Sequence, residues 1–509
     1  MNLQSSLSDL SQEAVAAFRQ ATSEGQGKPD ALLKTTTAGI TTGTGLIWFD
    51  LQVPAKNLFP VLTPLRNITP RVPGGGGTAT NWRRVTAINA LNQQPFVPEG
   101  YRGGVISTTA DSKSATYKPL GYEDSVTIEA ELAAVNFEDI RAMTAQRLLW
   151  ATMIGEEVAM LGANNSVTLA KPVIGALVTA ALGGAVAAGT YNVRVVALTL
   201  AGRQASAVNL AGCPGLVTVT NPNNYAFTFG GGASIKSDAV ATGILGGATN
   251  LISGYCAPVS GALAYAWFLD LGAGGELYLQ QITSINSFLQ LTTPVNTTQP
   301  MATTFDADHS TNTYAYDGLL YQAYTSGSNA YIATQATGAL GVGTPLTADG
   351  AGGIVELNSA FQSLWDNYRL GPSRLFVNSQ EANNISKKIL GTGAIYHFTT
   401  ENPSASLSNL TGGGRVKVYI NRFGMTGSVE VPIEIHPNLP AGTLVGYTER
   451  LPYPMPNVTN VAEVRLQRDY YQMEWPMRER RYDSGVYCNG VYAHYFPPSI
   501  MVVNNIGNG

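Results

Sequence analysis

The sequence carries little charge for its length. Asp, Glu, Lys and Arg make up only 13% of its 509 residues, whereas soluble globular proteins average about 25%. A large monomer normally keeps its surface solvated with charge, and permanent subunit interfaces are depleted of charged residues at their centres. The deficit therefore fits a subunit that covers its surface with copies of itself, or a neutral extracellular β protein rich in Thr, Asn and Gly.

Basic runs and cysteines are also scarce. The net charge is −4, and the densest basic cluster, residues 478–481, is interrupted by Glu479. No basic stripe for sequence-specific nucleic-acid binding is present, although weak contact with a polyanion stays open. The three cysteines are too few, and odd in number, for a disulfide framework. Cys213 and Cys256 could pair within one domain, but we expect buried thiols there.

Targeting and membrane segments are missing from the sequence. The first residues, MNLQSSLSDLSQEAVAAF, lack the basic start and continuous apolar core of a secretory signal. The Ala-rich stretch 173–188 is broken by glycines and falls short of the roughly 20 apolar residues that a membrane span needs. We expect a soluble protein made in a reducing cytoplasm.

Reactive motifs are missing too: there is no GxSxG, HExxH or P-loop. The four histidines stand far apart, at His309, His397, His436 and His494. Asp306, Asp308 and His309 could bind a cation, but no further ligand is spaced to close the site, so we expect a solvated loop. Glu156 and Glu157 are adjacent on a predicted helix and point in different directions. We therefore expect no enzyme, with no catalytic residue, cofactor or metal.

The N-terminal third predicts an arm followed by a long hairpin. Residues 5–24 have the apolar spacing of a short helix, and three prolines before Leu65 favour an extended segment. Strands are predicted at 82–88 and 114–132, where Val126, Ile128 and Ala130 alternate with polar residues. The loop between them is about 25 residues long, far beyond an ordinary hairpin loop. Its tip is apolar, which suggests that it reaches a partner.

Residues 136–162 have the strongest helical pattern. Asn136 fits an N-cap with acidic residues after it, and Gly162 fits the stop. The predicted apolar stripe is Ile140, Met143, Leu148, Ala151, Ile154, Val158 and Leu161. Adjacent residues 156 and 157 lie outside that stripe, so this pattern assigns them no role.

Charge almost vanishes between about 171 and 300, where short alternating runs predict a β-sandwich. Its text at 189–195 and 264–268 loosely resembles fibronectin-III or immunoglobulin-like modules. From Tyr314 the pattern is α+β. Helices are predicted over 354–369 and from 379, with strands at 374–378, 416–420, 429–435, 461–475 and 482–495.

The order of these elements resembles the HK97-like fold of the major capsid proteins of tailed bacteriophages. Two sequence segments support the resemblance: Pro64-Leu-Arg-Asn-Ile-Thr-Pro70 leading into Asn81-Trp82, and Leu370-Gly-Pro-Ser-Arg-Leu-Phe-Val-Asn378. The resemblance implies an α+β fold with six parts. They are an N-terminal arm (1–75), an E-loop hairpin with the start of the peripheral or P domain (76–135), the P-domain spine helix (136–171), an inserted immunoglobulin-like all-β sandwich (172–300), the axial or A domain (301–445), and a C-terminal return to the P domain (446–509).

The function implied by the resemblance is that of a non-enzymatic major capsid protein. It would be made in the host cytoplasm and would assemble into the icosahedral shell of a virion around double-stranded DNA. Its partners would be copies of itself in hexamers and pentamers, a portal, scaffold or decoration proteins, and DNA bound non-specifically, but no membrane. The predicted contacts between subunits are Phe59, Leu62, Phe96, Val97 and Tyr101.

Two further points complete this hypothesis. Some members of the family cross-link a lysine of the E-loop to a neighbour, but Lys113 and Lys118 sit away from the apolar tip here, so we expect no covalent cross-link. The alternatives are a secreted adhesin or carbohydrate-binding β-sandwich protein, and a cellular, encapsulin-like nanocompartment shell.

Overall fold

The computed structural model describes residues 61–87, 96–104, 109–134, 139–206, 212–221, 224–272, 274–301, 304–391, 415–424, 429–453 and 460–509. The chain forms two compact units, residues 1–58 with 129–140, and residues 59–128 with 141–509. The first unit is described only within helix α3 (Ile128–Ala134) and at 139–140. The expected helix at 5–24 lies outside the described residues.

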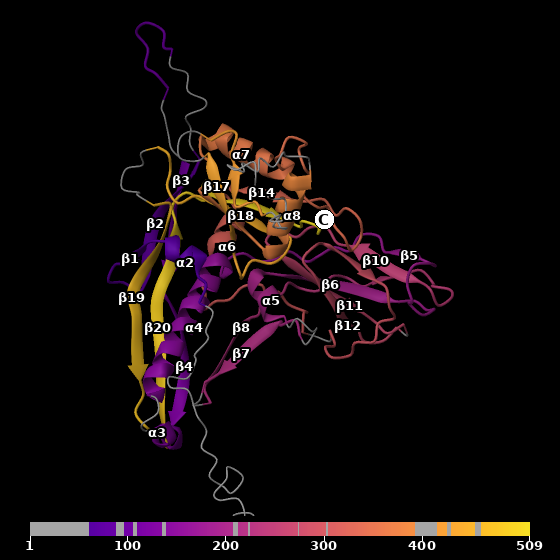
Figure 1. The fold of residues 1–509 in the computed structure, drawn as a ribbon, viewed down its shortest axis with the longest axis horizontal. Helices are drawn as coiled ribbons and strands as arrows, with labels where there is room; N and C mark the ends of the chain where they lie inside the picture. The colour runs from indigo at the N-terminus through magenta and orange to yellow at the C-terminus, as the bar shows by residue number, and fades with distance from the viewer. Residues whose placement is uncertain are drawn as a thin grey trace, which may run out of the picture. The chain divides into compact units, whose positions relative to one another are not determined.

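A four-stranded sheet joins segments from the two ends of the described chain. Its order is β1 (Arg71–Pro73), β19 (Ala462–Glu474), β20 (Arg481–His494) and β4 (Lys118–Thr127). β1 runs parallel to β19, and the other neighbours are antiparallel. Figure 1 shows the long yellow strands β19 and β20 beside strands from the early part of the chain.

A hairpin of β2 (Ala79–Ala87) and β3 (Thr109–Thr116) packs against the sheet. Trp82 and Tyr117 share an apolar cluster with Val491, Ala493 and Tyr495. The indole N–H of Trp82 donates to the carbonyl of His494 at 3.2 Å. The hairpin is thus held at its base by β20.

The strand expected over 114–132 was wrong at its C-terminal end. β3 stops at Thr116, β4 continues to Thr127 and pairs with β20, and α3 begins at Ile128. The alternation of apolar and polar residues from 126 to 131 misled the prediction. Residues 130–134, AELAA, are all strong helix formers, and their propensity decides the local structure.

Helix α4 (Ile140–Gly162) lies against one face of the sheet, where Met160 and Leu161 join Val464, Leu466 and Tyr492 in one apolar cluster. The expected N-cap, Asn136, lies outside the described residues. The expected apolar stripe is only partly right. Among its seven residues, Leu148 and Leu161 alone are buried. The buried residues are instead Thr144, Leu148, Thr152, Glu156, Glu157, Met160, Leu161 and Gly162.

Polar residues can face inward on α4 because each finds a partner. The Thr152 hydroxyl is 2.7 Å from the carbonyl of Leu148, one turn earlier, and also lies within reach of Val486 O. The two glutamates bind residues 65–71, as described below. The buried residues 144, 148, 152, 156 and 160 lie along one side of α4. Hydrogen bonds as well as apolar contacts stabilise their burial.

Residues 178–290 form two small sheets. The first has the order β13 (Ser287–Gln290), β10 (Leu251–Tyr255) and β5 (Val178–Ala180). The second has the order β12 (Tyr278–Thr283), β11 (Ala264–Leu269), β6 (Asn192–Leu198) and β9 (Val240–Ala241). Ile252 and Phe288 of the first share a core with Val195 and Trp267 of the second. The immunoglobulin-like character of this segment stays a prediction.

Strand β11 is buried on both faces. Tyr265, Trp267 and Leu269 fill the core between the sheets, while Ala264, Ala266 and Phe268 pack in a second cluster with Cys213 and Phe305. Between β6 and β9 the chain adds helix α5 (Leu200–Ala205) and a separate hairpin of β7 (Leu216–Thr220) and β8 (Ala226–Gly230).

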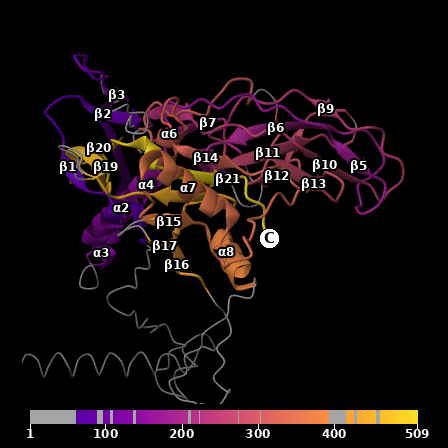
Figure 2. The ribbon, with the colours of Figure 1, turned by 90° about the horizontal axis from the view of Figure 1, so that it is seen from above.

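A six-stranded sheet organises the rest of the chain. Its order is β14 (Tyr331–Thr334), β21 (Met501–Asn504), β18 (Leu444–Tyr447), β15 (Arg374–Val377), β17 (Glu430–Ile435) and β16 (Val418–Ile420). Helices α7 (Val355–Tyr368) and α8 (Ser379–Gly391) lie where the sequence predicts helices. Leu357 and Phe361 of α7 and Ile385 of α8 pack with the sheet. Figure 2 shows both helices, in orange, beside strands of this sheet. Helix α6 (Leu319–Tyr324) is entirely buried.

The end of the chain departs from the expected return to a single sheet. Strands β19 and β20 join β4, but after the short turn Pro497–Ser499 the chain crosses to the six-stranded sheet, where β21 lies between β14 and β18. Met501 and Val503 are buried in the core of that sheet. The fold is thus α+β, as expected, with its last strand outside the sheet that was predicted for it.

Candidate functional site: a buried carboxylate pair that holds residues 63–71

The segment between the N-terminal residues and β1 forms one short helix, α2 (Pro64–Ile68). Pro64 stands at its first position, where the missing N–H is harmless. The Thr63 side chain makes no capping bond to the backbone and contacts the Asn67 side chain at 3.1 Å instead. The first N–H groups of a helix have no partner within it, so those of Leu65 and Arg66 need acceptors from elsewhere.

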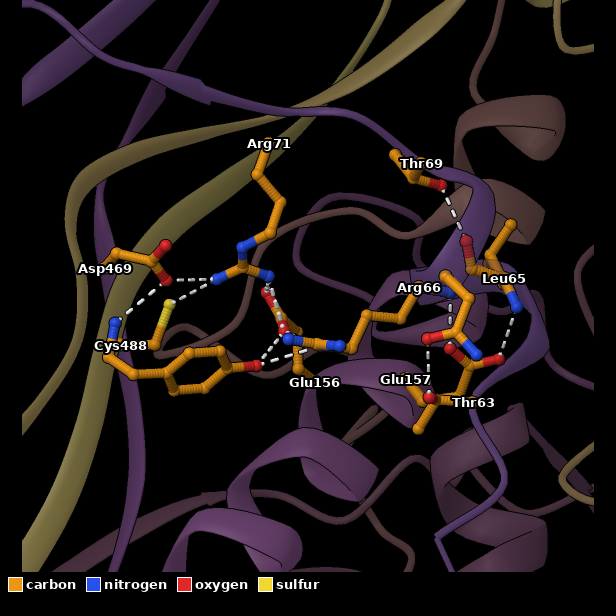
Figure 3. A network of polar contacts seen from close by, with 11 residues as sticks. Thr63, Leu65, Arg66, Thr69, Arg71, Glu156, Glu157, Asp469 and Cys488 are labelled. Carbon is orange, nitrogen blue, oxygen red and sulfur yellow. Dashed lines mark hydrogen bonds and ion pairs between the residues drawn. The ribbon is translucent and has the colours of Figure 1, made fainter.

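Glu157 of α4 provides both acceptors. The backbone N–H of Leu65 donates to Oε1 at 2.9 Å, and that of Arg66 donates to Oε2 at 2.7 Å. The Glu157 side chain is fully buried. A carboxylate from a distant helix thus caps α2 at the end where the peptide dipoles favour a negative charge. Figure 3 shows the Glu157 carboxylate beside Leu65 and Arg66, with dashed lines marking both contacts.

His436, in the turn after β17, completes the coordination of Glu157. Its Nε2 lies 2.6 Å from Glu157 Oε1, and both side chains are fully buried. Its Nδ1 accepts the backbone N–H of Asn438 at 3.2 Å. Because a backbone N–H can only donate, Nδ1 is the acceptor in that contact, and Nε2 is the nitrogen that donates to Glu157. The site therefore ties α2, α4 and the six-stranded sheet together.

Glu156, the preceding residue, binds the side chains of the same segment. It accepts from Arg66 Nε at 2.8 Å and from Arg71 Nη1 at 2.6 Å, and also from the Tyr470 hydroxyl. Arg71 reaches on to Asp469 at 2.6 Å, and its guanidinium lies 4.8 Å from the centre of the Tyr470 ring. Figure 3 shows this group to the left of the Glu157 cap.

The electrostatics of this group follow from burial and charge pairing. Burial alone would lower the pKa of the Arg71 guanidinium, but the Asp469 hydrogen bond and the Glu156 charge outweigh it and raise that pKa. Burial and the Glu156 carboxylate raise the pKa of Tyr470, so its hydroxyl stays protonated and donates. Three carboxylates face two guanidinium groups, one imidazole and the N-terminus of α2. Nothing in this arrangement resembles a reactive centre; its chemistry is that of a clamp, which we call the α2 clamp.

These two glutamates were not predicted as a site from the sequence. Neighbours on a helix do point in different directions, but residues 65–71 contact both of them. Glu157 binds the backbone of this segment and Glu156 binds its side chains. A signal was present. Two adjacent acidic residues stand in an otherwise uncharged stretch of helix, residues 148–162, within a chain of low charge.

The predicted intersubunit residues are not gathered at the α2 clamp. Phe59 lies outside the described residues. Phe96 and Tyr101 are 90% and 77% exposed, and Leu62 and Val97 are also exposed. Residues 98–101 form a tight turn in which the Tyr101 N–H donates to Pro98 O at 3.1 Å, and Gly100 has a φ of +84°, which a type II turn requires. Their contact with another subunit stays a prediction.

The candidate cation residues and the cysteines have ordinary structural surroundings. Asp306 pairs with Lys236, and Asp308 accepts the N–H and hydroxyl of Ser310. Within the described ranges no three His, Cys, Asp or Glu residues are grouped to hold a metal ion. The three cysteines are free and buried, as expected; His397 lies outside the described residues. No described helix is long and apolar enough to span a membrane.

Three solved structures similar to the chain are capsids. No protein-family model matches the sequence, and neither does any curated protein. The capsid of cyanophage P-SCSP1u has 9% identity and a TM-score of 0.38, over 95% of this chain and 99% of that one. The capsid of a native GTA particle has 8% identity and a TM-score of 0.41, over 94% of this chain and 100% of that one. The cyanophage A-1(L) capsid has 10% identity and a TM-score of 0.39, over 91% of this chain and 98% of that one.

Proposed function

We propose that this chain is the major capsid protein of a tailed bacteriophage, which assembles with copies of itself into an icosahedral shell around double-stranded DNA. The observation that carries the proposal is the α2 clamp. Buried ion pairs stabilise a fold less than apolar packing of the same volume would, because desolvation offsets their attraction. Their use at residues 65–71 therefore favours geometric definition: it fixes the segment that this proposal assigns to the end of the N-terminal arm.

The hairpin β2–β3 supports the same reading from a second direction. Its base is packed on β20, while its tip presents Phe96 and Tyr101 to solvent. Exposed aromatic bulk on a soluble protein marks a contact surface. Two extensions with fixed roots suit a subunit that reaches its neighbours, and many weak contacts in a closed lattice add up to a stable shell.

The finer parts of the proposal follow the family resemblance. Residues 1–75 are assigned as the N-terminal arm, 76–135 as the E-loop and start of the P domain, 136–171 as the spine helix, 172–300 as the insertion and 301–445 as the A domain. Residues 446–509 are assigned as the return to the P domain, which β19 and β20 make before β21 crosses to the six-stranded sheet. The shell would consist of hexamers and pentamers with a portal and with scaffold or decoration proteins. The protein would be made in the host cytoplasm, contact DNA non-specifically and act without catalysis.

The test is negative-stain electron microscopy with size-exclusion chromatography on the purified chain, alone and together with a candidate scaffold protein. Closed shells or rings support the proposal. A monomer that persists at high concentration under both conditions contradicts it and favours an adhesin. Shells that contain a cellular enzyme in place of nucleic acid, when isolated from the source cells, identify a nanocompartment.

A further inference from the structure

The hairpin of β7 and β8 is a two-stranded sheet of its own in the described chain, and Figure 1 shows it leaving the inserted segment as a separate ribbon. Cross-strand pairs Val217–Phe229 and Val219–Phe227 place four apolar side chains on one face. The other face carries three threonines beside Leu216 and Ala226, with a hydroxyl contact of 2.8 Å between Thr218 and Thr228. An isolated two-stranded hairpin is marginal in water unless its apolar face packs against something.

Only part of this apolar face is covered within the chain. The Tyr314 ring packs edge-on against Phe227 and Phe229, with centroids 5.6 Å and 6.4 Å away. Both phenylalanines remain partly exposed, Val219 is 40% exposed and Tyr314 itself is exposed. A strip of apolar surface is thus left open along the hairpin.

A cavity of about 230 Å³ adjoins this strip. Leu120 of β4 and Val158 and Ala159 of α4 line one side, and Gly230 at the base of β8 lines another. Tyr314 lines the cavity as well as touching the hairpin rings, so cavity and apolar strip form one surface, which we call the hairpin cleft. A cavity of about 150 Å³ is large enough to hold a benzene ring, so the cleft has room for one aromatic side chain with part of its backbone.

The base of the hairpin is rigid enough to form a wall. A Cβ on Gly230 would lie 2.2 Å from the carbonyl oxygen of Thr311, so the two backbones are in direct contact there. The Gly231 N–H donates to Gly215 O at 2.7 Å and the Gly232 N–H to His309 O at 2.9 Å. The cleft is therefore preformed on the hairpin side.

We propose that the hairpin cleft of one copy receives the turn at residues 96–101 of a second copy, with Phe96 or Tyr101 as the inserted ring. This inference rests on the proposed self-assembly and names the inserted hairpin as a contact that the shell would use. The occupant follows from three observations on the same chain. The turn is preformed by the Pro98–Tyr101 hydrogen bond, it exposes two aromatic rings, and the lining of the cleft is largely apolar, with Lys118 as its single charged residue.

Cysteine cross-linking tests the contact directly. Two chains of different mass, one carrying Phe96→Cys and the other Val219→Cys, are co-expressed, and the assembled particles are treated with a short bismaleimide. The matched control replaces Val219→Cys by Ile244→Cys, a residue that is 90% exposed outside the cleft. The native cysteines are buried and free, so they add little background.

The expected result is a mixed-mass dimer at a yield about tenfold above the Ile244 control, the margin expected of an interface anchor. A chain with both cysteines that cross-links only to itself overturns the inference, because the turn then covers its own cleft. Assembled shells without the cross-link also overturn it but leave the proposed function standing. Failure of the wild type to assemble overturns the proposed function and this inference with it.

A second measurement uses Val219→Asp, which places a charge on the open strip. We expect the assembled fraction to fall about tenfold, with an unchanged far-ultraviolet circular dichroism spectrum. Ile244→Asp is the matched variant and should assemble as the wild type does. Normal assembly of Val219→Asp would rule the cleft out as a contact.

Discussion

Glu157 and His436 lie 279 residues apart in the sequence and meet at 2.6 Å with both side chains fully buried. The imidazole donates from Nε2, and the same carboxylate caps α2 through Leu65 and Arg66. His436 thus orients the Glu157 side chain, and Glu157 holds the backbone of α2. The position of α2 therefore depends on the turn after β17. The predictions below test this dependence and three other consequences of burial.

The carboxylate of Glu157 should be worth more than any surface carboxylate of the chain. Glu157→Gln keeps the shape, but its amide offers one oxygen for two N–H donors and the imidazole. We expect a loss of about 1.5–3 kcal/mol in the free energy of unfolding, the worth of hydrogen bonds to a charged group. Urea unfolding measures it, and hydrogen exchange should show Leu65 and Arg66 losing protection first. The matched change is Glu474→Gln, in a surface pair with Arg141, which should lose less than about 1 kcal/mol. Equal losses in the two variants would contradict the clamp.

Arg71 should not tolerate lysine. Its guanidinium binds Glu156 through Nη1 and Asp469 through Nη2 at once, and an ammonium cannot reproduce that fork. We expect Arg71→Lys to lose about 1.5–3 kcal/mol, the worth of a hydrogen bond to a charged group. Arg83→Lys, on the exposed side of β2, is the matched change and should be neutral. Thermal unfolding of both variants measures the difference, and a neutral Arg71→Lys would show that the network adds nothing to stability.

His494 should make the fold sensitive to acid. Burial lowers its pKa to about 3, with the Arg84 charge adding to the effect, and neither ring nitrogen has a hydrogen-bond partner in the described structure. Since the folded pKa lies below the unfolded value of about 6.5, the unfolded chain binds the proton first. Neutral His494 therefore makes its full contribution to the free energy of unfolding above about pH 6.5. That contribution is lost as pH falls towards 3, by about 3 kcal/mol between pH 7 and pH 4.

The check is unfolding of His494→Phe across that pH range. Phenylalanine loses no hydrogen bond at this site, so the slope of stability against pH should flatten by about one proton. An unchanged slope in His494→Phe would assign the acid sensitivity to other groups.

The three thiols should be unreactive towards disulfide reagents in the folded protein. Burial raises the pKa of Cys213, Cys256 and Cys488 to about 12 each, and only the thiolate reacts with disulfide reagents. We expect no reaction with Ellman's reagent at pH 8 over an hour, and three equivalents after denaturation. Rapid reaction of one thiol without denaturant would show that its part of the fold opens.

Elements with long local patterns were predictable from sequence. The helices expected over 354–369 and from 379 are α7 and α8, and the closing strands expected over 461–475 and 482–495 are β19 and β20. In each, the periodicity of side chains facing one apolar core is a local property. The run 114–132 was misjudged where two local signals competed, alternation and the helix propensity of AELAA.

The sequence alone determined the charge deficit, the α+β character, the free cysteines and the apolar tip at residues 96–101. Only the tertiary structure decided which side of α4 is buried and that Glu156 and Glu157 act on one segment. Their partners stand 85 to 92 residues earlier and 279 and 314 residues later. A buried carboxylate is stable only where donors converge on it, and that convergence depends on how distant segments pack.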